Sequence, residues 1–302
     1  MKVNAALIGY GYWGEILRRY IDSSDKFSLK YVYFRSANQK GIFINNPDRI
    51  WKDNSVNIVF ISTPIETHYE LVKSAILAKK NVMCEKPLVT NKKQATLIKD
   101  MAELHKVKVV TDFTYTFSPS IRKIKEILQQ DIIGDIDFME MRMLQFGHFS
   151  KDSVFDVLAS HFFPVLFEWN LINDIVFEFN PLIRRHNVIE TGEVYFKNNN
   201  LKGRIVVSLN SPTRERTINI FGSKGFISFN PLREATLQLF LYKDYNWESN
   251  GWSNFENYEF DEKNNLNNAL DYLYNTLLGL EKDNLDMAIK VAAILEKAKE
   301  ST

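Results

Sequence analysis

The sequence predicts an α/β chain in two parts: a doubly wound parallel sheet domain, followed by an α+β domain with an open, mainly antiparallel sheet. Three observations support this fold class. An apolar run ends in a Gly9-x-Gly11-x-x-Gly14 pattern, strands and helices then alternate to about residue 112, and beyond that point strands follow one another directly. Alternation is typical of parallel sheets and consecutive strands of antiparallel ones.

The first part reads as a series of strand and helix units. Apolar and β-branched runs predict strands at Lys2–Ile8, Phe27–Phe34, Val56–Ser62, Asn81–Cys84 and Lys108–Thr111. Helical patterns occupy residues 15–23, 66–78 and 92–105. Right-handed crossovers at this spacing would build one parallel sheet.

The glycine pattern after the first strand is the dinucleotide-binding fingerprint of a Rossmann domain. Gly9 permits a tight turn, Gly11 leaves room for a pyrophosphate, and Gly14 lets the following helix pack closely. The helix N-terminus would offer N–H groups and a positive dipole end to the phosphates. Tyr12 and Trp13, inside the pattern, are expected beside the cofactor as well.

The end of the second strand bears on the choice of dinucleotide. About 20 residues past the glycines, a carboxylate usually bonds the ribose 2′-hydroxyl of NAD. Here Phe34 holds that position and Arg35 and Ser36 follow it. An arginine and a hydroxyl suit a 2′-phosphate, so NADP is the preferred cofactor and NAD a possible one. The alternative is that Arg35 is a solvated loop residue.

Polar residues follow two further strands of this part. Thr63 and Pro64 come after the strand at 56–62, with His68 close behind, and Glu85 and Lys86 come at the end of the strand at 81–84. Ligands of open parallel sheets bind at the carboxyl ends of the strands, so these side chains should line one crevice. His68 has the alternative of lying on a plain helix surface.

The second part begins near residues 112–120. Ser118-Pro119 starts a helix over 120–130, a strand covers 135–145, and 154–171 has helical spacing. Further strands are predicted at Ile175–Phe179, Glu193–Phe196, Gly203–Asn210, Thr217–Phe221, Phe226–Phe229 and Leu237–Leu241. Closing helices are predicted at Leu266–Leu280 and Leu285–Lys299. The domains are therefore expected at 1–117 and 118–302, with the helices of 266–299 packing back on the first.

Composition excludes several classes of function. The net charge of +1 gives no sign of nucleic acid or an anionic membrane as partner. The single Cys84 excludes an internal disulfide framework and fits a reducing, cytoplasmic location. The most apolar region, 154–179, contains too many polar residues to span a bilayer. No His, Cys, Asp and Glu set has metal-ligand spacing, so no metal is expected.

Six segments together resemble the Gfo/Idh/MocA family of NAD(P)-dependent oxidoreductases, which act on sugars and related polyols. The segments are GYGYWG at 9–14, STPIETHYE at 62–70, EKPL at 85–88, FSPSIRKIKEIL at 117–128, LASH at 158–161 and FGSKGFISF at 221–229. GYWG, THYE and EKPL are typical of the branch that acts on nucleotide-linked sugars. The resemblance implies a Rossmann domain and a sheet whose outer face makes a homodimer or homotetramer.

The resemblance also implies roles for single residues. Lys86 matches the catalytic lysine, Glu85 a cofactor contact, and the bond before Pro87 is expected to be cis. His161 matches the histidine that binds or polarises the reacting hydroxyl. A lysine or a histidine can also take the hydroxyl proton on chemical grounds. Tyr115 and His148 are further candidates for contact with the substrate. The alternatives are that Tyr115 is part of the cleft wall or the core and that His148 is an ordinary loop residue.

One position departs from the family pattern. An Asp usually stands four residues before the histidine, and here that residue is Val157. Asp156 is five residues before His161, which is about 140° around a regular helix. Three possibilities remain open: Lys86 acts alone, Asp156 reaches the site through an irregular helix, or catalysis has been lost.

Three functional hypotheses follow. The first is an NAD(P)-dependent oxidoreductase that moves a hydride between nicotinamide and a ring carbon of a nucleotide-linked or phosphorylated sugar. The second is a catalytically silent NADP(H)-binding sensor or scaffold. The third is a reductase of a non-sugar substrate, such as an imine or a tetrapyrrole.

Overall fold

The computed structural model describes residues 2–37, 40–171, 174–243 and 252–301. The chain divides into two compact units. The first contains residues 1–114 and 266–296, and the second contains residues 115–265 and 297–302. The sequence pattern predicted the boundary between the domains after residue 117.

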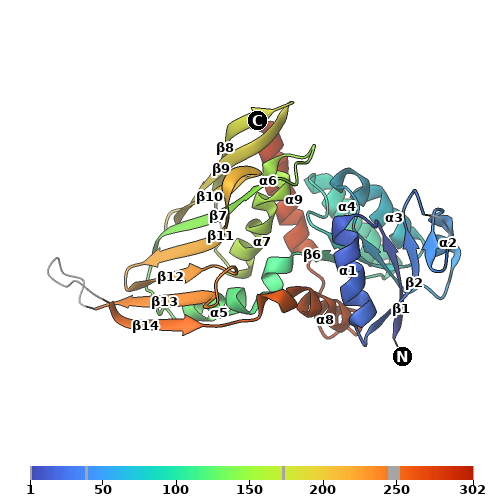
Figure 1. Cartoon of the computed structure of the whole chain (residues 1–302), viewed down its shortest axis with the longest axis horizontal. Helices are drawn as coiled ribbons and strands as arrows, with labels where there is room; N and C mark the ends of the chain where they lie inside the picture. The colour runs from blue at the N-terminus through green and yellow to red at the C-terminus, as the bar shows by residue number, and fades with distance from the viewer. Residues whose placement is uncertain (1, 38–39, 172–173, 244–251, 302) are drawn as a thin grey trace. The chain divides into compact units, whose positions relative to one another are not determined.

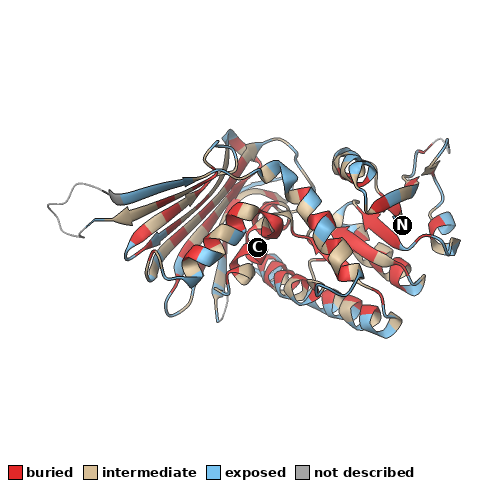
Figure 2. Cartoon of the chain, turned by 90° about the horizontal axis from the view of Figure 1, so that it is seen from below, coloured by how far each residue is buried: buried red, intermediate tan, exposed pale blue. Residues whose placement is uncertain are grey.

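The first unit is built on a six-stranded parallel sheet of order β3-β2-β1-β4-β5-β6. Its strands are β1 (Val3–Ile8), β2 (Phe27–Tyr33), β3 (Phe43–Ile44), β4 (Ile58–Ile61), β5 (Asn81–Glu85) and β6 (Val109–Asp112). Its helices are α1 (Tyr12–Ser23), α2 (Asp48–Lys52), α3 (His68–Leu77) and α4 (Lys92–His105), with a 3₁₀ turn at Ile65–Thr67. All residues of β4 and β6 are buried, as in a sheet covered on both faces. Figure 2 shows strands near the N-terminus drawn largely in the red of buried residues.

The two closing helices, α8 (Asn265–Leu277) and α9 (Leu285–Glu300), pack on this first unit along most of their length. The side chain of Asn284, just before α9, bonds both the N–H and the carbonyl oxygen of Thr111 on β6 at 2.8 Å. Lys99 of α4 pairs with Asp286 at 2.7 Å. These contacts attach the end of the chain to the edge of the parallel sheet.

The second unit is built on an eight-stranded sheet of order β14-β13-β12-β11-β7-β10-β9-β8. Neighbouring strands are antiparallel except for β7 and β10, which are parallel. The strands are β7 (Ile136–Phe146), β8 (Val176–Arg185), β9 (Val188–Lys197), β10 (Lys202–Ser208), β11 (Asn210–Gly222), β12 (Gly225–Phe229), β13 (Leu237–Tyr242) and β14 (Trp252–Tyr258). Burial alternates along β7 and β12, so one face of the sheet is packed and the other meets solvent.

The packed face is covered by the helical segments of the second unit (Figure 1). They are α5 (Pro119–Gln129), α6 (Val154–Val157) and α7 (Phe163–Glu168), with 3₁₀ turns at Thr114–Phe117, Ala159–His161 and Glu262–Asn264. The predicted start of α5 is confirmed: the Ser118 hydroxyl accepts the N–H of Ile121 at 3.2 Å, with Pro119 at the first helical position.

The fold class is confirmed, and several boundaries differ from the sequence prediction. The helix expected over 154–171 is broken into α6, a 3₁₀ turn and α7, with the break at Leu158. Strands β8, β9 and β11 are longer than predicted, and β3, α2 and β14 were not predicted. No helix in the described ranges combines the length and the apolar composition that crossing a bilayer requires.

Candidate functional site

The residues expected to bind a cofactor follow the carboxyl ends of neighbouring parallel strands. Gly9 follows β1, Thr63 lies just beyond β4, and Glu85 and Asp112 are the last residues of β5 and β6. Since β1 lies between β2 and β4, the strand order reverses direction beside the glycine turn. A crevice at such a switch point is where open α/β sheets bind their ligands.

The glycine turn has the geometry that a bound pyrophosphate requires. Gly9 has φ +98°, and a Cβ there would lie 2.2 Å from the carbonyl oxygen of Ser62. A Cβ on Gly14 would lie 2.2 Å from the Gly9 carbonyl oxygen, whereas one on Gly11 would have no heavy atom within 4 Å. The space above Gly11 is therefore open, and the N-terminus of α1 begins beside it at Tyr12. Helix N–H groups and the dipole favour an anion at that place.

The two aromatic residues inside the glycine pattern behave differently. Tyr12 is exposed, whereas Trp13 is half-buried, and its indole N–H donates to the Oε1 atom of Glu85. Trp13 therefore links the first turn of α1 to the end of β5. The sequence placed both residues beside the cofactor without finding this link.

Arg35 and Ser36 follow β2, where the sequence predicted recognition of the ribose 2′ position of the dinucleotide. Both are exposed, in the loop that follows β2. The backbone N–H of Gly9 donates to the Tyr33 carbonyl oxygen at 2.9 Å, so this loop begins directly beside the glycine turn. An exposed arginine here is accessible to a phosphate group.

His68 is a correction to the sequence prediction. Its ring is completely buried; Nδ1 lies 2.9 Å from the Pro87 carbonyl oxygen, and Nε2 lies 2.8 Å from the Thr63 carbonyl oxygen. Burial lowers the pKa of the imidazole. The ring leaves no surface for a cofactor, so we assign His68 to holding together the loops after β4 and β5.

The loop after β4 keeps the other two expected residues near the surface. Thr63 is half-buried, and its hydroxyl accepts from the Thr67 hydroxyl at 2.7 Å, while Pro64 is exposed. Because Gly9 packs against Ser62 and Thr63, this loop borders the glycine turn.

Glu85, Lys86 and Asp112 form the charged end of strands β5 and β6. The peptide bond between Lys86 and Pro87 is cis, as the family resemblance implied. Burial raises the pKa of Glu85 well above its ordinary value, and the Asp112 carboxyl raises it further. Burial also raises the pKa of Asp112, to about 6. The positive charge of Lys86 acts on both carboxyls in the opposite direction.

The second unit brings two of the expected substrate residues together. The rings of Tyr115 and His161 meet edge to face with centroids 5.5 Å apart. Burial raises the pKa of the Tyr115 hydroxyl, which interacts with the guanidinium of Arg216 on β11. Arg216 was not among the residues predicted from the sequence, although Arg214-x-Arg216 places two cations on alternate positions of one strand.

Asp156 and Val157 lie on α6, before the helix breaks. Asp156 is buried and Val157 is half-buried. The angular separation of about 140° assumed one regular helix, and the break at Leu158 removes that assumption. The helix between Asp156 and His161 is therefore irregular, which is the condition under which Asp156 was expected to reach the site.

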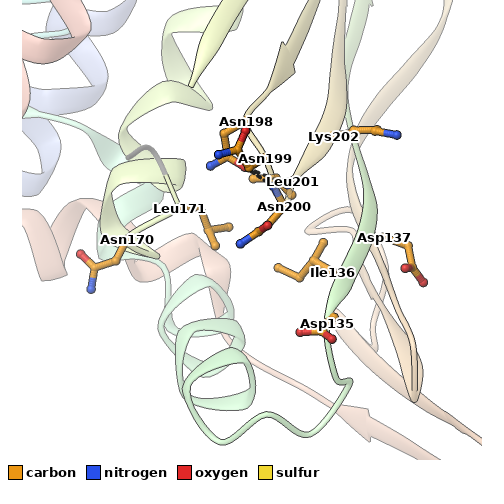
Figure 3. A pocket seen from close by; sticks show the side chains of 10 residues that line it. All are labelled: Asp135, Ile136, Asp137, Asn170, Leu171, Asn198, Asn199, Asn200, Leu201 and Lys202. Atoms are coloured by element: carbon orange, nitrogen blue, oxygen red, sulfur yellow. Dashed lines mark hydrogen bonds between the residues drawn. The ribbon is translucent and has the colours of Figure 1, made fainter. Parts of the chain in front are cut away.

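His148 is exposed in the loop between β7 and α6, with a left-handed φ of 54°. A cavity of about 740 Å³ lies at the opposite end of β7. Figure 3 shows Leu171 and Ile136 facing each other across it, with Asn200 of the β9–β10 turn between them. None of the sequence-predicted site residues lines this cavity. In the described part of the chain, no cluster of His, Cys, Asp and Glu side chains is suited to a metal ion.

Comparison with known families gives a match to the first segment of the first unit. Residues 3–113 match the sequence model of the Gfo/Idh/MocA family, described as "Oxidoreductase family, NAD-binding Rossmann fold". The resemblance expected from the sequence motifs is thus confirmed over these residues.

Curated relatives match over the same part of the chain. An uncharacterized oxidoreductase of Synechocystis is 31% identical over 108 residues, which is 36% of this chain and 29% of that protein. A myo-inositol 2-dehydrogenase of Thermotoga maritima is 32% identical over 89 residues, which is 30% of this chain and 27% of that protein. The matched segments thus span under a third of both relatives.

Solved structures match the whole fold at low sequence identity. A UDP-N-acetylglucosamine 3-dehydrogenase of Acidithiobacillus ferrooxidans has a TM-score of 0.84 and 16% identity, covering 100% of this chain and 98% of its own. A variant of a 3-ketoreductase of Actinomadura kijaniata, solved with TDP-benzene and NADP, has a TM-score of 0.87 and 13% identity, with the same two coverages. These similarities establish the fold of both units.

Proposed function

We propose, on the premise that residues 3–113 are the NAD-binding Rossmann domain of the Gfo/Idh/MocA oxidoreductase family, that this chain is an NAD(P)-dependent oxidoreductase. The proposed reaction moves a hydride between nicotinamide and a ring carbon of a sugar. The observation that carries the proposal is the open glycine turn after β1, with Lys86 at the end of the nearby strand β5.

The proposal gives separate tasks to the cofactor and to the chain. The bound nicotinamide would supply or accept the hydride. Gly11 and the N-terminus of α1 would hold its pyrophosphate. Lys86 is the first candidate to exchange a proton with the reacting hydroxyl, and His161, whose ring contacts that of Tyr115, is the other candidate.

For the cofactor, we propose a preference for NADP over NAD. The loop after β2 presents Arg35 and Ser36 where NAD-specific domains place a carboxylate. An arginine fork pairs with phosphate in a bidentate way, whereas a ribose hydroxyl offers it no charge. Structural neighbours were solved with NADP and with NAD, so the preference depends on these two residues.

For the substrate, we propose a sugar that is linked to a nucleotide or carries a phosphate. One structural neighbour is named a UDP-N-acetylglucosamine 3-dehydrogenase, and another, a 3-ketoreductase, was solved with TDP-benzene. In this chain the guanidinium of Arg216 lies beside Tyr115 and supplies a positive charge that a phosphate would neutralise.

Val157 supports a second candidate, a cofactor-binding protein without catalysis. The residue stands where relatives are expected to have an acid, and a valine cannot orient a histidine by hydrogen bonding. Such a protein would sense NADP(H) or act as a scaffold.

A thermal-shift matrix of the four dinucleotides, each with and without nucleotide-sugars, tests both candidates. Ligands that bind the native state raise the Tm by mass action. The oxidoreductase predicts shifts with NADPH and with a nucleotide-sugar, and turnover of that pair. Shifts with NADPH alone, and no turnover across the sugars, favour the silent protein.

The role of Lys86 has its own test. We expect Lys86→Ala to lower turnover about 10²- to 10⁴-fold, the usual contribution of a general acid or base. The NADPH affinity of the variant serves as the control, and should change far less. Full turnover of the alanine variant would refute the role of Lys86.

We also propose that the outer face of the eight-stranded sheet joins copies of this chain. Five aromatic residues occupy paired positions on adjacent strands: Phe138, Phe221, Phe226, Phe240 and Phe255. This phenylalanine ladder is only partly buried, and Phe221 and Phe255 are 38% and 48% exposed. An exposed apolar row on a sheet face is typical of an interface.

Charged pairs continue the same face beyond the ladder. Arg142 pairs with Glu215 at 2.7 Å, and the Nε of Arg204 donates to Glu140 at 2.6 Å. An apolar strip beside paired charges has the core-and-rim composition of a homo-oligomer interface. A homodimer or homotetramer through this face is the expected assembly.

A further inference from the structure

Two carboxyl groups meet at the carboxyl edge of the parallel sheet. Glu85 ends β5, Asp112 ends β6, and the two residues are partners in the register of this parallel strand pair. Side chains in register on neighbouring parallel strands point to the same face of the sheet. Glu85 and Asp112 accordingly lie within hydrogen-bonding distance of each other.

The hydrogen bonds of these carboxyls are incomplete without a shared proton. Asp112 is 1% exposed; its Oδ1 accepts from the Thr114 hydroxyl at 3.2 Å, and its Oδ2 is buried without a donor among the described residues. Glu85 uses Oε1 to accept the indole N–H of Trp13. A buried acceptor without a donor is costly, and the carboxyl of Glu85, the register partner of Asp112 on β5, becomes a donor when it is protonated.

The charges around the pair also disfavour two ionised carboxylates. Burial raises the pKa of both carboxyls, and the charge of Asp112 raises that of Glu85 further. Lys86 acts on both carboxyls and supplies one positive charge. Cys84, the next titratable group on β5, is fully buried with a raised thiol pKa, so it stays neutral. The single positive charge of Lys86 balances one negative charge. The two carboxyls together carry only one negative charge when one of them is protonated.

We propose that Glu85 and Asp112 share one proton, which Glu85 donates to the Oδ2 atom of Asp112, and that Asp112 is a positioning residue for Glu85. In this arrangement Glu85 accepts from Trp13 on one side and donates to Asp112 on the other. The pair then fixes the first turn of α1 relative to the strand that carries Lys86. Only the consequence for cofactor binding rests on the proposed function.

The direction of the pH effect follows from the raised pKa values. Between the ordinary carboxyl pKa of about 4 and the raised native values, the native state holds a proton that the unfolded chain has released. Over that range the pair lowers the stability as pH rises. Glu85→Gln removes the effect, because its amide donates to Asp112 and its oxygen accepts from Trp13 without titrating.

The first experiment measures the Tm of the cofactor-free protein from about pH 5 to about pH 8. We expect the Tm of the wild type to fall relative to Glu85→Gln by about 2–4 °C per pH unit. Glu66→Gln, at an exposed glutamate of the 3₁₀ turn after β4, is the matched control and should follow the wild type. A constant difference between wild type and Glu85→Gln would overturn the shared proton, whether or not the protein turns over a sugar.

Two further measurements keep the proposal falsifiable if one variant folds poorly. The infrared band of a protonated carboxyl should be present at neutral pH in the wild type and absent in Asp112→Asn; its absence from both overturns the proposal. In NADPH titrations, Asp112→Asn should recover most of the roughly tenfold affinity that Asp112→Ala loses, because its amide still donates to Glu85. Equal affinities of the two variants would overturn the positioning role.

Discussion

Replacing single glycines of the turn by alanine should separate folding from cofactor binding. Gly11 and Gly14 stand three residues apart, yet an added Cβ meets different surroundings at each. At Gly14 it would lie 2.2 Å from the carbonyl oxygen of Gly9, and at Gly11 it would have open space within 4 Å. We therefore expect Gly14→Ala to destabilise the fold and Gly11→Ala to remove the cofactor while the fold stays intact.

The magnitudes follow from these two environments. At Gly14 the obstacle is a backbone atom, so the first turn of α1 must shift, at a cost of about 3 kcal/mol. The higher helix propensity of alanine offsets about 1 kcal/mol, which leaves a loss of about 2 kcal/mol and a Tm lower by about 4–8 °C. At Gly11 the backbone is extended, with φ −88° and ψ −165°, which alanine adopts freely. The Tm of that variant should change by under about 2 °C.

The assay is a thermal scan of both variants and a titration with NADPH. A methyl group above Gly11 would occupy the space assigned to the pyrophosphate, so the affinity should fall about tenfold or more, or about 1.4 kcal/mol. Unchanged NADPH affinity of Gly11→Ala would refute the placement of the pyrophosphate. An unchanged Tm of Gly14→Ala would refute the packing argument.

Two other predictions concern exposed residues. Arg35→Ala should weaken NADPH binding about tenfold, the value of about one charge-assisted hydrogen bond, and leave NADH binding unchanged; equal losses for both dinucleotides would contradict a 2′-phosphate contact. Phe240→Glu should dissociate the oligomer in light-scattering measurements, because it places a charge in the middle of the phenylalanine ladder, where the Phe226 ring stacks on it at 4.2 Å. Phe149→Glu, at a loop phenylalanine that is 52% exposed and outside the ladder, is its control; an unchanged mass of Phe240→Glu would argue against an interface there.

The fold class could be predicted from the sequence because the hydrophobic pattern of each strand reflects how that strand is buried. Strands of the parallel sheet are continuous apolar runs, since both of their faces are covered, and β4 and β6 are buried at every residue. The helical prediction over 154–171 failed because hydrophobic spacing does not detect a break in a helix that is buried on several sides. Leu158 has φ −109° at that break, between α6 and the following 3₁₀ turn.

The geometry of the glycine turn agrees with the sequence because each glycine acts through its own backbone. Gly9, Gly11 and Gly14 have the conformations and the space that their spacing indicates. The prediction for His68 failed because a histidine near the surface and one locked between two carbonyl groups have the same sequence pattern. Asp112 was not predicted as a site residue, because its role depends on Glu85, its neighbour on another strand.

The sequence by itself determined the two-part architecture, the glycine turn and the likeness to a family of oxidoreductases, and the cis bond before Pro87 was expected from that likeness. These properties reside in segments of a few residues, where spacing and residue type suffice. Only the tertiary structure decided that Trp13 binds Glu85, that Glu85 lies beside Asp112, and that five phenylalanines form one ladder. Each of those contacts joins different elements of the chain, and the pairing of neighbouring strands brings the last two sets together.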